Sequence, residues 1–512
     1  MTRTAHAIKN ISFGVLSKSV SFILGFVSRT VFIYVLGATY LGINGLYSEI
    51  LSMLSFAELG FGAAFTFAMY KPVANNDEKQ LIKLLASYKK IYFIVALVIL
   101  VGGLSLLPFL QFIVKGAKSI TANELKLYYL IFLSNTVMSY FVTYKYSIVN
   151  AYQKYYIITN FEMISNIVTL LLQIIILLIF KNFTLYLLTQ SLVLIISRIF
   201  ISVYLNHRFP IMNKHTSEKL SENEKKLIFK ESRGLMVHQF SSLAVHSTDN
   251  IIISMFTGLG VVTVGLISNY NMLITSITGF LIIIFSSVAS GFGNLVAEEN
   301  TKQYHKTFLE LNFLNYWLYG FCCISFFVLI PPFIKLWIGE KNLIDMATFS
   351  LIIVNCFLEG QSSLYNYARN AKGDFNRDKW WSLLQAIVNL VVSIIGAMLF
   401  GLVGVYIGTV VSRLVYVIFR PYNTYEFLFN VSPKEYYLKL IKYFSVTCIL
   451  CVVTYFITMP LLMNVSVLGF IVSCFIVLIF PNAIIYFIFK RSEEFNNLTN
   501  RVKNILIRGR KF

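Results

Sequence analysis

Apolar segments long enough to cross a membrane follow one another along almost the whole chain, and this feature limits the possible folds more than any other. A transmembrane helix needs about 20 mostly apolar residues. Such segments are predicted near residues 11–36, 41–70, 91–114, 127–150, 156–180, 183–206, 234–256, 260–290, 309–334, 345–368, 380–399, 402–419, 443–460 and 464–489. The sequence therefore predicts an all-α integral membrane protein with about 14 transmembrane helices.

The charge composition agrees with a membrane protein. Charged residues make up 13% of the chain, about half the share usual in soluble proteins. The net charge of +20 would suggest nucleic acid as a partner of a soluble protein. Here the basic residues lie in short segments between apolar runs, where they set topology and contact anionic lipid headgroups. We therefore predict membrane lipids, and not nucleic acid, as partners.

The distribution of basic residues predicts the orientation. With the N-terminus in the cytoplasm, 32 of the 43 Lys and Arg residues fall in cytoplasmic segments and 6 in outside loops, while the other 5 lie within the spans. Basic residues concentrate on the cytoplasmic side of membrane proteins. The sequence thus predicts a multi-pass protein of a bacterial inner membrane with both termini in the cytoplasm.

An internal repeat relates the two halves of the chain. A shift of 223 residues pairs Leu36-Gly37 with Leu259-Gly260, Gly42 with Gly265, Tyr47 with Tyr270, Val73-Ala74 with Val296-Ala297, Lys79-Gln80 with Lys302-Gln303 and Lys83 with Lys306. Further on, a shift of 220 pairs Asn150-Ala151 with Asn370-Ala371 and Ile167-Val168 with Ile387-Val388. The shift spans six helices, an even number, so the two halves have the same orientation in the membrane. Such repeats are a signature of transporters.

The repeat predicts four parts of the chain. These are an N-terminal six-helix lobe at 1–206, a cytoplasmic linker at 207–231, a C-terminal six-helix lobe at 232–419, and two further helices with a basic tail at 420–512. Rocking of one lobe against the other would expose a central cleft to each side of the membrane in turn.

Charged residues inside the spans are the first candidates for a substrate site, because a charge at the bilayer centre costs about 2.5–3.5 kcal/mol on the insertion scale. Arg29 and Asp249 occupy similar positions on the first helix of each half. We hypothesise that Arg29 meets an anionic substrate group and that Asp249 meets a cation or a hydroxyl. The alternative is simple pairing between the basic and acidic residues of the spans, which also include Glu58, Lys145 and Glu359.

Polar stripes on three helices are the second group of candidates. Ser48, Ser52 and Ser55 align in the repeat with Asn271, Thr275 and Thr278, and each set lies on one helix face. A third stripe holds Glu359, Ser362, Asn366 and Arg369. Uncharged polar faces suit sugar hydroxyls, and hydrogen bonding between helices is the alternative use of Ser and Thr.

Motifs of enzymes are missing from the sequence. It contains no G-x-x-x-x-G-K-[ST] loop for nucleotide phosphates, no H-E-x-x-H and no G-x-S-x-G. We predict no catalytic site, no metal site and no cofactor. Energy for transport would come from a coupling gradient of H+ or Na+, from the gradient of the substrate, or from consumption of the product outside.

Several motifs along the chain resemble a known family, the bacterial flippases of O-antigen and capsule repeat units. The resemblance rests on Ser28-Arg29-Thr30-Val31-Phe32, Leu36-Gly37, Tyr40-Leu41-Gly42, Gly45-Leu46, Ala57-Glu58-Leu59-Gly60, Tyr70-Lys71-Pro72, Thr248-Asp249-Asn250-Ile251-Ile252-Ile253, Ser268-Asn269-Tyr270, Gly293-Asn294-Leu295 and Gly404-Val405-Tyr406-Ile407-Gly408-Thr409. This family belongs to the multidrug/oligosaccharidyl-lipid/polysaccharide (MOP) superfamily. The motifs cover nearly the whole chain.

The resemblance implies a V-shaped pair of six-helix lobes that carries undecaprenyl-pyrophosphate-linked glycan repeat units from the cytoplasmic to the outer leaflet. It implies surface-polysaccharide assembly, with a polysaccharide polymerase and glycosyltransferases as further partners. It also implies a cationic cavity, which Arg29 and Lys145 match in kind. The balanced charges of the spans depart from this pattern and leave the sign of the cavity open.

Other functions fit parts of the same sequence. Two are transport functions of the same superfamily, namely a cation-coupled multidrug exporter and a flippase of peptidoglycan precursors. A glycan polymerase or acyltransferase would be expected to carry a large external loop, whereas the external loops here reach only about a dozen residues by the predicted spans. A non-transporting scaffold of a glycan-assembly complex would have little use for polar stripes in two matched halves.

Overall fold

The computed structural model describes residues 3–58, 61–214, 216, 218, 220–256, 258, 260–297, 300–372, 377–463 and 466–509. Within these ranges the chain forms helices and no strand, and ten of the helices are long and apolar enough to cross a membrane. The predicted all-α, multi-pass membrane protein is confirmed. Contacts between residues divide the chain into two compact units, Met1–Ser268 with Ala397–Gly401, and Asn269–Gly396 with Leu402–Phe512. The lobe boundaries predicted from the repeat stay a prediction.

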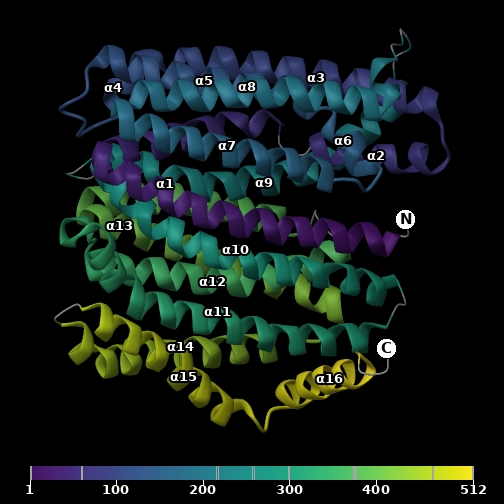
Figure 1. The fold of residues 1–512 in the computed structure, drawn as a ribbon. Coiled ribbons are helices and arrows are strands. Elements are labelled where there is room, and N and C mark those ends of the chain that lie inside the picture. Colours follow the sequence, from purple (N-terminus) through teal and green to yellow (C-terminus); the bar gives the residue numbers. More distant parts are fainter. Residues whose placement is uncertain are drawn as a thin grey trace. The chain divides into compact units, whose positions relative to one another are not determined.

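Unit 1 contains the helices that precede residue 269. They are α1 (Arg3–Leu54), α2 (Phe61–Ala74), α3 (Glu78–Ser105), the short α4 (Leu110–Ile113), α5 (Ala122–Thr143), the short α6 (Tyr146–Ala151), α7 (Tyr156–Phe180), α8 (Phe183–Arg208) and α9 (Glu222–Phe256). In Figure 1, α3, α5 and α8 run alongside one another, and α7 packs on both α1 and α8. Helix α10 (Val261–Ala297) begins in unit 1 and continues into unit 2.

Polar side chains in the loops set the starts of these helices. The Asp77 carboxylate accepts a hydrogen bond from the backbone N–H of Gln80 and caps α3. At the start of α5, Thr121 and Glu124 form a reciprocal capping box. Such caps satisfy backbone donors that the first helical turn leaves free. The short loops between apolar runs therefore carry the information that ends one span and begins the next.

The first predicted span and the start of the second form one helical element, α1, which is interrupted at a glycine. Helix α1 runs through Gly37, whose φ of +82° lies outside the helical region. Glycine tolerates this conformation because it lacks a Cβ atom. The segment 41–70, predicted as one span, is divided in the structure. Helix α1 ends at Leu54, a turn of 3-10 helix covers Ser55–Glu58, and the separate helix α2 begins at Phe61.

Unit 2 contains α11 (Thr301–Ile338), α12 (Met346–Ala371), α13 (Lys379–Phe429), α14 (Lys434–Leu462), α15 (Val467–Phe489) and α16 (Glu493–Gly509). Helices α14 and α15 pack against α11 and against each other (Figure 1). The predicted spans 380–399 and 402–419 are the two sides of a break in α13 at Gly401, whose φ is +58°. After this reversal Gly396 and Gly404 meet so closely that a Cβ on Gly404 would lie 1.9 Å from the Gly396 carbonyl oxygen.

Two glycines paired by the repeat meet at a crossing of α1 and α10 within unit 1. A Cβ on Gly42 would lie 1.9 Å from the carbonyl oxygen of Val261, and a Cβ on Gly265 would lie 2.0 Å from that of Ala38. The shift of 223 residues carries Ala38 to Val261 and Gly42 to Gly265, so the two contacts are equivalent. This reciprocity is what a local two-fold relation between repeat-equivalent helices requires, and it explains why both positions hold glycine.

The close crossing of α1 and α10 predicts that a single methyl group added at Gly42 destabilises the protein. We expect Gly42→Ala to destabilise the protein by about 1–3 kcal/mol or more, because the added carbon meets backbone that cannot move away cheaply. Gly45→Ala is the matched control on the same helix, since its Cβ would have its nearest neighbour at 3.8 Å, an ordinary contact. Thermal unfolding of both purified variants in detergent measures the difference. Equal melting temperatures for the two variants would contradict the close crossing.

Candidate functional site

The three arginines inside the predicted spans fall into a pair with carboxylate partners, Arg198 and Arg413, and one without such a partner among the described residues, Arg29. In unit 1 the Arg198 guanidinium lies 3.8 Å from the Glu162 carboxylate. In unit 2 that of Arg413 lies 3.4 Å from Glu359. Pairing neutralises charges that would be costly inside a membrane. The predicted alternative of simple pairing thus describes these residues, including Glu359.

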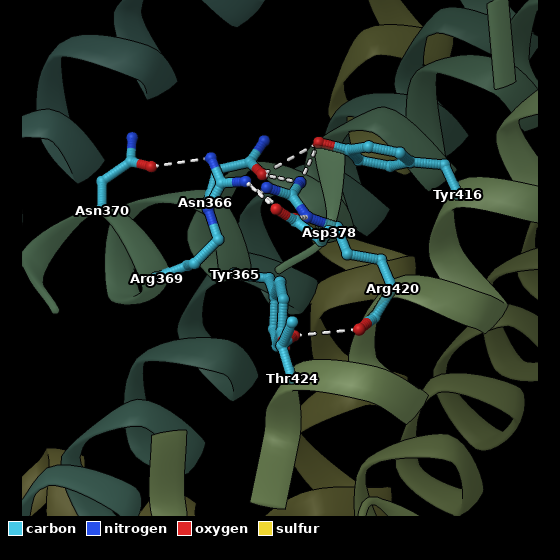
Figure 2. Close-up of polar contacts among 8 residues, drawn as sticks. All are labelled: Tyr365, Asn366, Arg369, Asn370, Asp378, Tyr416, Arg420 and Thr424. Atoms are coloured by element: carbon cyan, nitrogen blue, oxygen red, sulfur yellow. Dashed lines mark hydrogen bonds and ion pairs between the residues drawn. The ribbon is translucent and has the colours of Figure 1, made fainter. Parts of the chain in front are cut away.

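A buried charged cluster in unit 2 is centred on Asp378 (Figure 2). This aspartate precedes α13, is fully buried, and accepts hydrogen bonds from Arg369 at 2.7–2.8 Å and from Arg420. Arg420 also donates to the Asn366 side chain and to the Tyr416 hydroxyl. Its guanidinium lies 4.4 Å from the centre of the Tyr416 ring, which stabilises the excess positive charge. The cluster ties the end of α12 to both the start and the later part of α13.

This cluster changes the interpretation of the third predicted stripe. Arg369 is buried, with its guanidinium in the ion pair with Asp378, and Asn366 accepts from Arg420. In this conformation the Arg369 side chain does not line an accessible surface. Asp378 and Arg420 were missed, because both lie in segments assigned to cytoplasmic connections and stand 42 residues apart. No spacing in the sequence indicates such a contact.

Arg29 has no carboxylate partner among the described residues. Its guanidinium donates a hydrogen bond of 2.6 Å to the Ser268 hydroxyl and stays half-buried. Arg29 lies eight residues before the Gly37 break, about 12 Å along the helix axis, and therefore well inside the span Ser19–Leu54. Because an unpaired guanidinium binds anions strongly, Arg29 is available to an anionic ligand.

Among the described basic side chains of the predicted spans, Lys145 is the second without a carboxylate partner. It is buried, and its ammonium donates to the Ser202 hydroxyl and the Asn206 side-chain oxygen, each at 2.7 Å. These neutral acceptors satisfy the ammonium at the end of α8. Lys145 therefore adds positive charge to unit 1 without reaching its accessible surface in this conformation.

Three carboxylates belong to α1 after the Gly37 break or to its surroundings. They come from α1 itself, from α9 and from the 3-10 turn that follows α1. Glu49 accepts a 2.7 Å hydrogen bond from the Asn250 amide, and its charge lies near that of Asp249. The structure therefore places Asp249 beside Glu49, while Arg29 binds Ser268. At the end of this segment, Glu58 accepts a hydrogen bond from the Tyr92 hydroxyl. Two neighbouring carboxylates favour a bound proton or cation.

The first two predicted polar stripes, on α1 and α10, lie on accessible faces of their helices. Ser48 and Ser52 are exposed and Ser55 is half-buried, while the opposite face of α1 buries Leu46 and Ile50. In unit 2, Thr275 is exposed, and Asn271 and Thr278 are half-buried. The Ser and Thr hydroxyls donate to their own helix four residues back, at 2.7–3.0 Å. Their oxygen lone pairs remain free to accept hydrogen bonds from a ligand.

Comparison with known proteins identifies the family. Residues 7–290, more than half of the chain, match the family described as polysaccharide biosynthesis protein. The chain belongs to this family. The predicted resemblance is thereby confirmed at the level of the family, and the polar faces of α1 lie in the matched part. No curated protein matches the chain significantly.

Solved structures of MOP-superfamily transporters share the fold of this chain. The lipid II flippase MurJ in an inward closed conformation is 16% identical, with a TM-score of 0.65, over 93% of this chain and 98% of its own. An inward-facing multidrug resistance MATE transporter is 15% identical, with a TM-score of 0.59, over 81% and 96%. A MOP transporter from Pyrococcus furiosus is 14% identical, with a TM-score of 0.53, over 81% and 93%. The all-α membrane fold of the MOP superfamily, which the resemblance implies, is confirmed.

The buried charged cluster of unit 2 predicts a large loss of stability when its aspartate is replaced by an uncharged residue. We expect Asp378→Asn to destabilise the protein by about 3–5 kcal/mol, because two buried arginines would lose their carboxylate. Glu359→Gln is the control: it also removes a partner of an arginine, but the Glu359 side chain is 46% exposed, so a loss of about 0–1 kcal/mol is expected. Thermal unfolding in detergent separates the two, and a smaller loss for Asp378→Asn than for Glu359→Gln would refute the assignment.

Proposed function

We propose that this protein is a flippase that carries undecaprenyl-pyrophosphate-linked oligosaccharide repeat units from the cytoplasmic to the outer leaflet for the assembly of a surface polysaccharide. Membership of the polysaccharide biosynthesis family and a fold shared with a lipid II flippase support the proposal. The observation that carries it is Arg29, which has no carboxylate partner among the described residues, although Arg198, Arg413 and Arg420 each have one.

In this proposal Arg29 binds the pyrophosphate. A guanidinium can donate two parallel hydrogen bonds to phosphate oxygens, and these charge-assisted bonds are stronger than its present bond to a neutral hydroxyl. The Ser268 hydroxyl, 2.6 Å away, would then be free to donate to the same anion. The polar faces around Ser52 and Thr275 accept hydrogen bonds from sugar hydroxyls, while the polyprenyl tail remains in the lipid.

Glu49 and Asp249 are proposed to couple transport to a gradient of H+ or Na+. Their charges lie close together, and Asn250 contributes an amide to the same place. Binding of a proton or a sodium ion relieves the repulsion between two carboxylates. Release of that cation on the other side would favour the return of the empty protein.

The proposed cellular setting follows from the same substrate. We place the protein in a bacterial inner membrane with both termini in the cytoplasm, where 32 basic residues lie against 6 outside by the predicted spans. Glycosyltransferases would build the lipid-linked substrate on the cytoplasmic side, and a polymerase would consume it outside.

Two other transport functions compete with this proposal. Export of cationic drugs is favoured by the carboxylates of Glu49 and Glu58, which lack basic partners among the described residues, and by the MATE-like fold. Transport of a peptidoglycan precursor is favoured by the likeness to MurJ. Drug-resistance assays test the first function, and essentiality for growth tests the second.

Deletion of the gene tests the proposed substrate. We expect lipid-linked repeat units to accumulate on the cytoplasmic side and surface polysaccharide to disappear, with growth and drug resistance unchanged. Labelled lipid-linked intermediates, assayed for accessibility from each side of membrane vesicles, provide the measurement. Normal amounts of surface polysaccharide in the deletion strain would reject the proposal.

Arg29 provides a second prediction. We expect Arg29→Leu to reduce transport about tenfold or more, the equivalent of one lost charged hydrogen bond or more, while the variant still inserts in the membrane. Ser268→Ala is the comparison variant: it removes one neutral hydrogen-bond donor but keeps the cation, so we expect a smaller loss of transport than for Arg29→Leu. Complementation of the deletion strain, with protein levels measured in membranes, gives the readout. Full activity of Arg29→Leu would refute the role in anion binding.

A further inference from the structure

Two polar stripes lie opposite each other on α7 and α8, within unit 1. On α7 the stripe consists of Glu162, Ser165, Asn166 and Thr169, spaced i, i+3, i+4 and i+7 along one helix face. On α8 it consists of Gln190, Ser197 and Arg198, spaced i, i+7 and i+8. Together with Phe161, Leu194 and Ile201, these residues line one cavity of about 230 Å³, the α7–α8 pocket.

The α7–α8 pocket lies in helices apolar enough to span a membrane, yet its charged residues indicate that it faces a hydrated space. Both helices are apolar enough to cross a membrane, and other faces expose large apolar side chains such as Ile175 and Leu192. The Glu162 side chain in the pocket is 47% exposed. A carboxylate facing lipid would cost about 2.5–3.5 kcal/mol, so this opening faces a hydrated space in place of hydrocarbon.

The charges of the α7–α8 pocket balance. Its one carboxylate, Glu162, lies 3.8 Å from its one guanidinium, Arg198, which also donates to the Tyr146 hydroxyl. A cationic drug would meet the arginine, and a phosphate would meet the glutamate. A ligand without net charge avoids both repulsions.

The remaining polar groups offer both donors and acceptors. Asn166 donates to the Ser21 hydroxyl at 2.9 Å, which leaves its amide oxygen to accept. Thr169 donates to the Ser165 carbonyl at 2.8 Å, so its hydroxyl oxygen can also accept. The Gln190 amide has no hydrogen-bond partner among the described residues and can both donate and accept. This mixture suits hydroxyl groups, each of which donates one hydrogen bond and accepts others.

The size of the α7–α8 pocket limits the ligand further. Pockets for drug-sized ligands hold about 300–1,000 Å³, and this one is smaller. It has room for about eight waters at roughly 30 Å³ each. That volume suits one sugar ring, whose C–H face could rest on Phe161, but not an oligosaccharide.

We propose that the α7–α8 pocket binds one uncharged sugar unit of the transported glycan. This inference rests on the proposed function and adds a second contact to it: Arg29 holds the anionic group, and the pocket selects a neutral sugar. Substrate choice would then depend on the side chains of α7 and α8 as well as on the pyrophosphate, which all lipid-linked glycans of this class share.

Saturation-transfer NMR on the full-length protein in detergent tests the proposal. The probes are glucose, galactose, mannose and N-acetylglucosamine, with glucuronate and tetraphenylphosphonium as charged rivals. We expect at least one neutral sugar to bind and neither rival to compete with it. Gln190→Leu and Thr169→Val should each weaken that binding about fivefold, as expected for one neutral hydrogen bond.

Thr189→Val is the matched control for Thr169→Val. Thr189 lies beside Gln190, is half-buried outside the pocket, and also donates to its own helix, at 2.7 Å to the Leu185 carbonyl. Its substitution should leave sugar binding unchanged. If Gln190→Leu fails to fold, the two threonine variants alone decide, since both substitutions keep the shape of the side chain.

Three results would overturn the proposal: binding of no neutral sugar, displacement of the sugar by either rival, or equal losses for Thr169→Val and Thr189→Val. The deletion experiment separates this failure from failure of the proposed function. Accumulation of lipid-linked repeat units without sugar binding would reject the pocket alone. Sugar binding without such accumulation would reject the flippase.

Discussion

Charge inside a membrane needs an opposite charge, a set of hydrogen bonds or water, and the arrangement of this protein depends on how each charge meets that need. Asp378 neutralises one of two buried arginines and ties both sides of α13 to α12. Arg413 and Arg198 each have one carboxylate neighbour. Against this background Arg29 stands apart, because a serine hydroxyl is its hydrogen-bond partner. The same rule that stabilises the fold therefore indicates the residue available to an anion.

Glycine residues let the helices change direction and pack closely against one another. At Gly37 and Gly401 the chain changes direction within a helical element, since both residues adopt positive φ values. At Gly42 and Gly265 the missing Cβ atoms let α1 and α10 cross with backbone in contact. Because the two close contacts are equivalent under the repeat, the crossing lies where a two-fold relation of the matched helices would place it. A small residue there serves packing, whereas the serines of α1 beside it serve an accessible face.

The proposals divide recognition of one substrate among several places. Arg29 suits the anionic pyrophosphate, which every substrate of the proposed class carries. The charge-balanced α7–α8 pocket suits a neutral sugar, which differs between glycans. Glu49 and Asp249 suit a small cation and not a second anion, because their charges repel each other. These chemistries also separate the rival functions, since a drug exporter would depend on the carboxylates and a polysaccharide flippase on Arg29.

Much of the fold could be predicted from local features of the sequence. Apolar runs predicted the helices, the gaps between predicted spans fell at the later-observed breaks at Gly37 and Gly401, and a repeat of 223 residues paired the two positions that meet at the α1–α10 crossing. The accessible faces around Ser52 and Thr275 followed from helical periodicity. The stripe from Glu162 to Thr169 has the same periodicity and was overlooked, because its polar residues are sparse within a strongly apolar segment. Local patterns of this kind depend only on residues a few positions apart.

Only the tertiary structure decided which charges are paired. Arg420 and Asp378 are 42 residues apart, and Arg29 and Ser268 are 239 apart. No period connects such positions, and equal numbers of acids and bases in the spans permit many pairings. The choice among them depends on which helices pack together and how side chains point from them. Sequence alone thus determined the membrane fold and its matched halves, whereas packing determined that Arg369 is buried with Asp378, that Arg29 lacks a carboxylate partner among the described residues, and that the polar stripes of α7 and α8 enclose a pocket.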